Sequence, residues 1–123
     1  MAKILVAEDN DIVRAFIVRA LGGDGHDLIE AEDGESALAK LYASNGEFDL
    51  LLSDVKMPGM DGIELALAAG RKHPEIPIML MTGYADQRER AHGLDALVHD
   101  VISKPFSIDQ ITCAVREALV QRH

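Results

Sequence analysis

Short apolar runs alternate with longer amphipathic stretches along the whole chain, and this alternation limits the folds that it can adopt. The apolar runs are four to six residues long, and the stretches between them show helical spacing over ten to fourteen residues. Such alternation is typical of a parallel sheet with helices on both faces, and near-continuous apolar runs fit strands buried on both faces. The sequence therefore predicts a doubly wound α/β fold with five parallel strands and five helices. The predicted strands span about residues 3–7, 26–31, 48–53, 78–82 and 98–103.

The first predicted helix follows Asp9 and Asn10 and has one apolar face. Residues on that face recur at i, i+3, i+4, i+7 and i+8. They are Val13, Phe16, Ile17, Ala20 and Leu21. On this spacing four other residues point outward to solvent, namely Asp11, Arg14, Ala15 and Val18.

The other predicted helices carry signals of different strength. The second begins after a turn at Asp33, and the third covers about residues 62–73. The fourth, at about 84–93, is polar and has few core anchors, so we expect a mobile element there. The fifth opens with a capping box formed by Ser107 and Gln110.

The length of 123 residues fits one compact domain, residues 1–123. A net charge of -9 argues against nucleic acid and against anionic membrane surfaces as partners. No apolar run approaches the roughly 20 residues of a membrane span, and the chain enters a strand at once, so we expect no signal peptide. The single cysteine, Cys113, excludes an intramolecular disulfide and suits the cytoplasm.

Chemically active side chains stand at the C-terminal ends of four predicted strands. Glu8 and Asp9 follow the first strand, and Asp54 follows the third. Thr82 ends the fourth strand, and Lys104 follows the fifth. Open α/β sheets bind their ligands at the carboxyl ends of the strands, so we expect these groups to lie together.

Carboxylates gathered at one edge of a sheet favour a bound cation. Two carboxylates about 4 Å apart repel by roughly 4 kcal/mol at an effective dielectric constant near 20. Oxygen ligands without His or Cys favour Mg²⁺ or Mn²⁺. Asp54 is then the expected nucleophile, which would form an aspartyl phosphate. Lys104 and Thr82 would bind phosphoryl oxygens, and Gly83 would leave room for the phosphoryl group to enter.

Each of these residues also has a purely structural explanation. Asp9 or Asn10 can cap the first helix. Thr82 can be an ordinary strand residue, Lys104 a solvated surface charge, and Asp61 only a turn residue. The site hypothesis depends on the set, because the groups stand at the same end of successive strands.

Together these residues resemble the receiver domain of bacterial response regulators over the whole chain. Glu8–Asp9 matches the acidic pair of that family, and residues 54–62 match its phosphoacceptor loop. Thr82–Gly83 matches the switch hydroxyl and its small neighbour, and residues 104–106 match the lysine motif. The resemblance implies a flavodoxin-like strand order 2-1-3-4-5. It also implies phosphorylation of Asp54 by a histidine kinase or a histidine phosphotransferase.

The resemblance further implies a ligand set for the metal. Mg²⁺ would be held by the carboxylates of Asp9 and Asp54 and by the backbone carbonyl of Lys56. Glu8 would act on the ion through a water molecule.

The segment around the lysine has two notable features. Family members aim the lysine with a cis peptide, so the bond between Lys104 and Pro105 is expected to be cis, a form that X-Pro bonds reach at about 0.5–1 kcal/mol. The family often carries Tyr or Phe three residues before the lysine, and here Val101 stands at that position. Switching is therefore expected to involve Thr82, the loop after it and the fourth helix.

The predicted function is that of a signalling module and not of an enzyme. Residues 62–66, 81–85 and 101–106 also resemble the CpdR-type single-domain regulators, which implies regulated proteolysis with the ClpXP protease as a downstream partner. A phosphorelay intermediate is the other interpretation. A phosphohydrolase of the haloacid-dehalogenase type would need a second acid two residues after the nucleophile, where this sequence has Lys56. A docking module that is never phosphorylated is the remaining alternative.

Two surfaces are predicted to bind proteins. The kinase or phosphotransferase is expected on the first helix, at Asp11, Arg14, Ala15 and Val18. The output surface is expected on the fourth helix, fifth strand and fifth helix. Its charged residues are Arg88, Arg90, His92, Asp100 and Arg116. We expect a monomer, with a phosphorylation-dependent dimer as the alternative.

Overall fold

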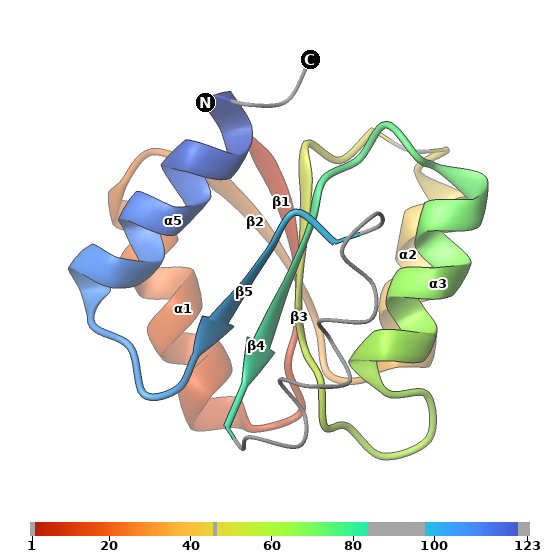
Figure 1. Ribbon diagram of the computed structural model, residues 1–123, viewed down its shortest axis with the longest axis horizontal. Coiled ribbons are helices and arrows are strands. Elements are labelled where there is room, and N and C mark those ends of the chain that lie inside the picture. The colour runs from red at the N-terminus through yellow and green to blue at the C-terminus, as the bar shows by residue number, and fades with distance from the viewer. Residues whose placement is uncertain (1, 46, 84–97, 121–123) are drawn as a thin grey trace.

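The computed structural model describes residues 2–45, 47–83 and 98–120, which form five strands and four helices (Figure 1). The elements are β1 (Lys3–Ala7), α1 (Asp11–Gly23), β2 (Asp27–Ala31), α2 (Gly34–Ala43), β3 (Leu50–Asp54), α3 (Gly62–Lys72), β4 (Ile78–Thr82), β5 (Asp100–Ser103) and α5 (Ile108–Val120). The fourth predicted helix, residues 84–93, lies outside the described residues. None of the helices in the described ranges combines the length and apolar character that crossing a membrane requires.

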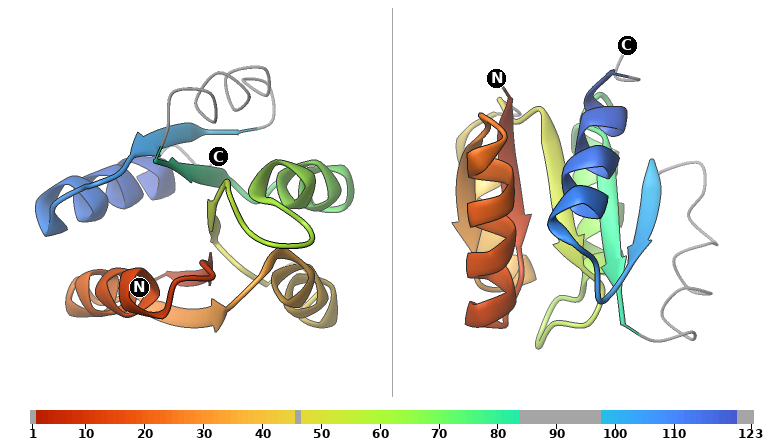
Figure 2. Two further views of the ribbon diagram at one scale, coloured as in Figure 1. Left: turned by 90° about the horizontal axis from the view of Figure 1, so that it is seen from below. Right: turned by 90° about the vertical axis from the view of Figure 1, so that its left-hand side faces the viewer.

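The five strands form one parallel sheet in the order β2-β1-β3-β4-β5, which confirms the predicted doubly wound fold and strand order. Helices α1 and α5 cover one face of the sheet, and α2 and α3 cover the other (Figure 2). The chain passes from β1 outward to β2 and then returns across β1 to β3. Ligands of such sheets bind where the strand order reverses, which here lies between the ends of β1 and β3.

Alternating side chains of each strand enter two separate apolar cores. In β1, Leu5 belongs to the core under α2 and α3, whereas Ile4 and Val6 belong to the core under α1 and α5. In β3, Leu51 and Leu50 divide in the same way. Each of these side chains is at most 1% exposed. Burial on both faces explains why β1, β3 and β4 read as near-continuous apolar runs and not as alternating patterns.

The predicted strand boundaries differ from the observed ones by at most two residues. The strands β2, β3 and β5 begin at Asp27, Leu50 and Asp100, later than predicted, and β3 extends to include Asp54. The reason at β3 is that Phe48 is buried without belonging to the strand. Its apolar side chain lengthened the predicted run, although only the residues from Leu50 onward pair with β1.

The buried face of α1 is rotated relative to the prediction. Phe16, assigned to the core from its spacing, is 38% exposed. Arg14 and Val18, predicted to point outward, are partly buried. The buried residues of α1 are Ile17, Ala20 and Leu21. Asp11 and Ala15 are exposed, as predicted.

The start of α5 follows the sequence prediction. The backbone N–H of Ser107 donates to Oε1 of Gln110 at 2.7 Å, and the backbone N–H of Gln110 donates to Oγ of Ser107 at 3.1 Å. This reciprocal capping box fixes the direction in which the chain leaves β5 and enters α5.

Candidate functional site

The loop between β1 and α1 presents two carboxylates in different environments. Glu8 is 1% exposed, whereas Asp9 is exposed. Asn10 caps α1, because its side-chain oxygen accepts hydrogen bonds from the backbone N–H groups of Ile12 at 2.9 Å and Val13 at 3.1 Å. The N–H of Asn10 donates to Oε2 of Glu8 at 3.1 Å. Asn10, and not Asp9, is therefore the N-cap of α1. Among the described residues, none forms a hydrogen bond or ion pair with the Asp9 carboxylate.

Asp54 is the last residue of β3 and is 6% exposed. The start of α3 passes so close to it that a Cβ atom at Gly62 would lie 2.1 Å from the Asp54 carbonyl oxygen. Asp61 caps α3 through a reciprocal capping box, in which its side chain accepts from the N–H of Glu64 at 2.8 Å. Asp61 is thus a structural residue, and glycine is required where α3 packs against the strand end.

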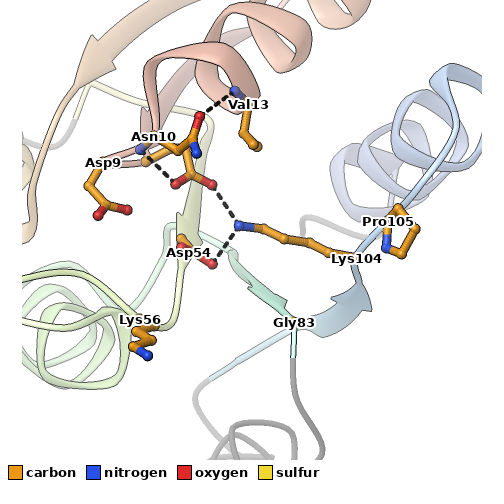
Figure 3. A pocket seen from close by; sticks show the side chains of 9 residues that line it. Asp9, Asn10, Val13, Asp54, Lys56, Gly83, Lys104 and Pro105 are labelled. Carbon is orange, nitrogen blue, oxygen red and sulfur yellow. Dashed lines mark hydrogen bonds and ion pairs between the residues drawn. The ribbon is translucent and has the colours of Figure 1, made fainter.

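Lys104 directly follows β5 and reaches across the end of the sheet. Its backbone N–H donates to the carbonyl of Thr82 at 2.7 Å, and the peptide bond that joins it to Pro105 is cis. Its ammonium lies 2.8 Å from Oε1 of Glu8 and 3.0 Å from Oδ1 of Asp54 (Figure 3). The Lys104 side chain is only 23% exposed, so it is not an ordinary solvated surface charge.

The three carboxylates form a compact set of oxygen donors. Glu8, Asp9 and Asp54 each contribute one oxygen, and these oxygens lie within 4.8 Å of one another. A donor set of carboxylates without His or Cys fits a hard divalent cation such as Mg²⁺ or Mn²⁺.

Most of the predicted site residues line one cavity of about 480 Å³. Its lining consists of the three carboxylate residues together with Asn10, Val13, Lys56, Gly83, Lys104 and Pro105. Thr82 is buried at the end of β4 and does not belong to this lining. The structure therefore brings together strand ends that are far apart in the sequence.

The electrostatics of the site favour an additional positive charge. Burial raises the pKa of Glu8 and of Asp54, although the hydrogen bonds from Lys104 act in the opposite direction. Burial alone would lower the pKa of Lys104, but its hydrogen bonds to the two carboxylates outweigh this effect and the pKa is raised. One ammonium faces three carboxylates, so the site keeps an excess of negative charge that a bound cation would offset.

Arg14, predicted to face a partner protein, instead supports the acidic loop. Its guanidinium donates to the carbonyl of Glu8 at 2.7 Å, to Glu30 at 3.1 Å and to Asp11 at 2.7 Å. These bonds explain why the Arg14 side chain is only 15% exposed. Of the four residues predicted for docking, Ala15 is the one that is exposed and takes no part in this network or in the core.

The sequence did not predict an apolar groove that lies beside the site. Ile12 is 82% exposed, and the rings of Phe16 and Phe106 lie 6.2 Å apart. We call the cavity of about 350 Å³ between α1 and the β5–α5 loop the α1 groove. Its lining residues are Ile12, Val13, Phe16, Lys104, Pro105 and Phe106. The i, i+4 spacing of Ile12 and Phe16 is the one local signal for it, since Phe106 comes from the distant end of the chain.

The predicted output residues are only partly described. Arg88, Arg90 and His92 lie outside the described residues. Asp100 is exposed at the start of β5. Arg116 is bound to Asp24 at the C-terminal end of α1 through two hydrogen bonds, one of them 2.7 Å long, and these bonds lower the pKa of Asp24. Arg116 therefore links α5 to α1.

Known proteins resemble this chain in both sequence and structure. A family model described as the response regulator receiver domain matches residues 4–116. The chain is 36% identical to the response regulator receiver protein CpdR of Brucella abortus over 98% of both chains. It is 34% identical to the DNA-binding transcriptional regulator NtrC of Salmonella typhimurium over 94% of its own length, but it spans only 24% of that protein.

Among solved structures, the chemotaxis protein CheY4 of Vibrio cholerae superimposes with a TM-score of 0.86 at 28% identity, covering 97% of this chain and 99% of that one. The chain spans less than half the length of several transcriptional regulators that it resembles. The agreement with CheY4 extends over nearly the full length of both folds.

Proposed function

Because the chain belongs to the family of response regulator receiver domains, and so to two-component signalling, we propose that it is a switch that accepts a phosphoryl group on Asp54. One observation carries this proposal. The Lys104 ammonium binds Asp54 and Glu8 at the mouth of a cavity in which Asp9 has no described partner. A nucleophile, a phosphate-binding cation and an acidic metal site are thereby adjacent.

The transfer step uses groups that stand at the strand ends. An oxygen of the Asp54 carboxylate attacks the phosphorus of a phosphohistidine donor. The new P–O bond forms as the P–N bond breaks, and the electron pair of that bond stays on the histidine nitrogen. Lys104 then exchanges a carboxylate oxygen for a phosphoryl oxygen. The Thr82 hydroxyl, which does not line the cavity in this structure, would turn toward the phosphoryl group to bind another oxygen.

The metal site completes the charge balance of the transfer. Mg²⁺ would be held by Asp9, Asp54 and the backbone carbonyl of Lys56, with Glu8 nearby. When bound, the ion supplies positive charge against the phosphoryl oxygens. The oxygen-only donor set of the three carboxylates supports this assignment.

The α1 groove is the proposed docking surface for the phosphodonor, a histidine kinase or a histidine phosphotransferase. The groove is apolar. It shares Val13, Lys104 and Pro105 with the lining of the cavity of about 480 Å³ around Asp54, which we call the phosphorylation cavity. A donor helix seated on Ile12 and Phe106 would bring a histidine toward Asp54. This location replaces the polar α1 face that the sequence predicted, since Arg14 is engaged within the protein.

The proposed output is a change in partner binding on phosphorylation. The chain is similar to CpdR over nearly the full length of both chains. This similarity supports, as the proposed output, the regulated proteolysis through ClpXP that the resemblance to CpdR-type regulators implies. The alternative output is the passing of the phosphoryl group to a further histidine protein in a phosphorelay.

Incubation with acetyl phosphate and Mg²⁺ tests the proposal. We expect about one phosphoryl group per chain, and none in an Asp54→Asn variant. Rapid continuous release of phosphate would instead favour a phosphohydrolase, and the absence of labelling would favour a docking module. Labelling of the variant at the normal rate would exclude Asp54 as the acceptor.

A further inference from the structure

A second groove, the β5–α5 groove, lies between the edge strand of the sheet and the last helix. Its volume is about 590 Å³. Three apolar residues on its surface, Ile102, Phe106 and Ala114, are partly buried because they also pack against the core under α1 and α5. They form a fixed apolar floor that stays accessible from outside, and Phe106 is shared with the α1 groove.

Acidic side chains surround this floor. Asp100, Asp109 and Glu117 line the groove, and all three are exposed. No Lys or Arg stands among the described residues that line it. Arg116, the neighbour of Glu117, is bound to Asp24 of α1. Its charge also acts on Asp109, so it offsets the negative charge of the rim only in part.

We propose that the β5–α5 groove binds a basic amphipathic segment of a partner protein. Apolar side chains of the segment contact Ile102 and Phe106, and its Lys or Arg side chains pair with the acidic rim. A volume of about 590 Å³ accommodates a few side chains of such a segment. An acidic segment, or a second copy of a chain with a net charge of -9, would be repelled.

The groove is connected to the phosphorylation site through the backbone. Ser103 lines the groove and pairs in register with Thr82, and Phe106 follows Pro105. Two groove residues thus bracket the Lys104–Pro105 segment. Any displacement of Lys104 toward a phosphoryl group would reach both of them. The inference deepens the proposed function by naming the chemistry of a partner, and it relies on that function only for this link.

Peptide binding to the unmodified full chain tests the inference. Two peptides of about 15 residues share their apolar positions and carry either Lys or Glu at the polar ones. Cys113 is the only cysteine of the chain and lines the groove, so its rate of alkylation reports occupancy of this groove. We expect the Lys peptide to bind, to slow alkylation of Cys113 and to dissociate at high salt. Binding without protection of Cys113, or equal binding of the Glu peptide, would overturn the inference.

Two triple variants separate the groove from the overall charge. Asp100→Asn, Asp109→Asn and Glu117→Gln remove the rim charges, whereas Asp27→Asn, Glu47→Gln and Glu75→Gln remove three exposed charges elsewhere. We expect the rim variant to bind the Lys peptide about tenfold more weakly, because it loses three solvent-accessible ion pairs between the rim carboxylates and lysines of the peptide. The second variant should bind the peptide normally. Equal weakening in both would indicate general attraction to an acidic protein and contradict the inference.

Acetyl phosphate labelling of the same preparations distinguishes failure of the proposed phosphorylation of Asp54 from failure of the proposed peptide binding in the β5–α5 groove. Both triple variants leave the residues of the phosphorylation cavity unchanged, so normal labelling shows that each variant is folded with an intact site. Loss of peptide binding alone then concerns the groove, and loss of labelling in the unmodified chain concerns the function of Asp54.

Discussion

Asp54 is a buried carboxylate that the metal-free protein stabilises poorly in its ionised form. Burial raises its pKa in the folded state, whereas the carboxyl of the unfolded chain titrates at about 4. The folded state therefore binds the proton more tightly, and the contribution of Asp54 to stability falls as the pH rises from about 4 through the raised pKa. An Asp54→Asn variant has no carboxyl at this position and does not lose this stability as the pH rises. We therefore expect the free energy of unfolding of the variant, relative to that of the unmodified protein, to increase from pH about 4 through the raised pKa of Asp54. Urea unfolding in the presence of a chelator measures this difference. An advantage that is the same at acidic and neutral pH would contradict this.

Glu8 and Asp9 are neighbours with unequal freedom to bind a metal. The Glu8 carboxylate already binds the Lys104 ammonium and the N–H of Asn10, whereas Asp9 has no described partner. We expect Asp9→Asn to weaken Mg²⁺ binding by about tenfold or more, and Glu8→Gln by less. Calorimetric titration of the two variants gives the ranking directly. The reverse order would assign the direct ligand to Glu8.

The junction of β3 and α3 requires a residue without a side chain. A Cβ at Gly62 would lie 2.1 Å from the Asp54 carbonyl oxygen, and its nearest neighbours are all backbone atoms of Asp54 and Val55, which cannot rotate away as a side chain could. We expect Gly62→Ala to lower the free energy of unfolding by about 1–3 kcal/mol and to slow labelling of Asp54.

Gly22 is the matched control for that substitution. It lies in the last turn of α1, and a Cβ at this position would have no atom within 4 Å, so Gly22→Ala should stabilise the helix by up to about 1 kcal/mol. Thermal unfolding of both variants checks the opposite signs. Equal and small shifts would mean that α3 can move away from Asp54.

The docking surface proposed for the phosphodonor on α1 includes Ile12, which lines the α1 groove. We expect Ile12→Asp to slow transfer from a phosphohistidine donor by about tenfold, because it places a charge in the α1 groove, and to leave labelling by acetyl phosphate unchanged. Ala15→Asp adds the same charge at an exposed position of α1 outside the groove lining and should have a smaller effect. If Ala15→Asp were the more damaging change, the polar face predicted from the sequence would be the docking surface.

The strands could be predicted more closely than the faces of the helices. Burial on both faces leaves an apolar run that can be located in the sequence to within two residues. The orientation of α1 depends on partners that local spacing does not contain. Arg14 is drawn inward by Glu30 and by the Glu8 carbonyl, and Phe16 is drawn outward toward Phe106. Periodicity alone could not supply either contact.

The fold gathers the site from four connections at one edge of the sheet. That gathering could be predicted, because parallel strands bring all their C-terminal ends to the same side. The individual contacts could not. Nothing in the sequence decides that Lys104 binds Glu8 as well as Asp54, or that Asn10 and not Asp9 caps α1. These outcomes depend on side-chain distances that only the assembled sheet fixes.

The same assembly connects the cavity to both grooves through residues 103–106. Lys104 lines the phosphorylation cavity and the α1 groove, and Ser103 lines the β5–α5 groove. Phe106 belongs to both grooves. A group bound at Asp54 that pulls the Lys104 ammonium away from Glu8 should therefore change the surroundings of Cys113 without touching it.

We expect beryllofluoride with Mg²⁺, which mimics the phosphoryl group, to change the alkylation rate of Cys113 by about twofold or more. In a Lys104→Gln variant the mimic should leave that rate unchanged, because the link between the cavity and the groove is the lysine. An Asp54→Asn variant controls for direct effects of beryllofluoride on the thiol reagent. If the rate changed equally with and without Lys104, the coupling would run through another part of the molecule. If it changed in neither, the cavity and the β5–α5 groove would be independent.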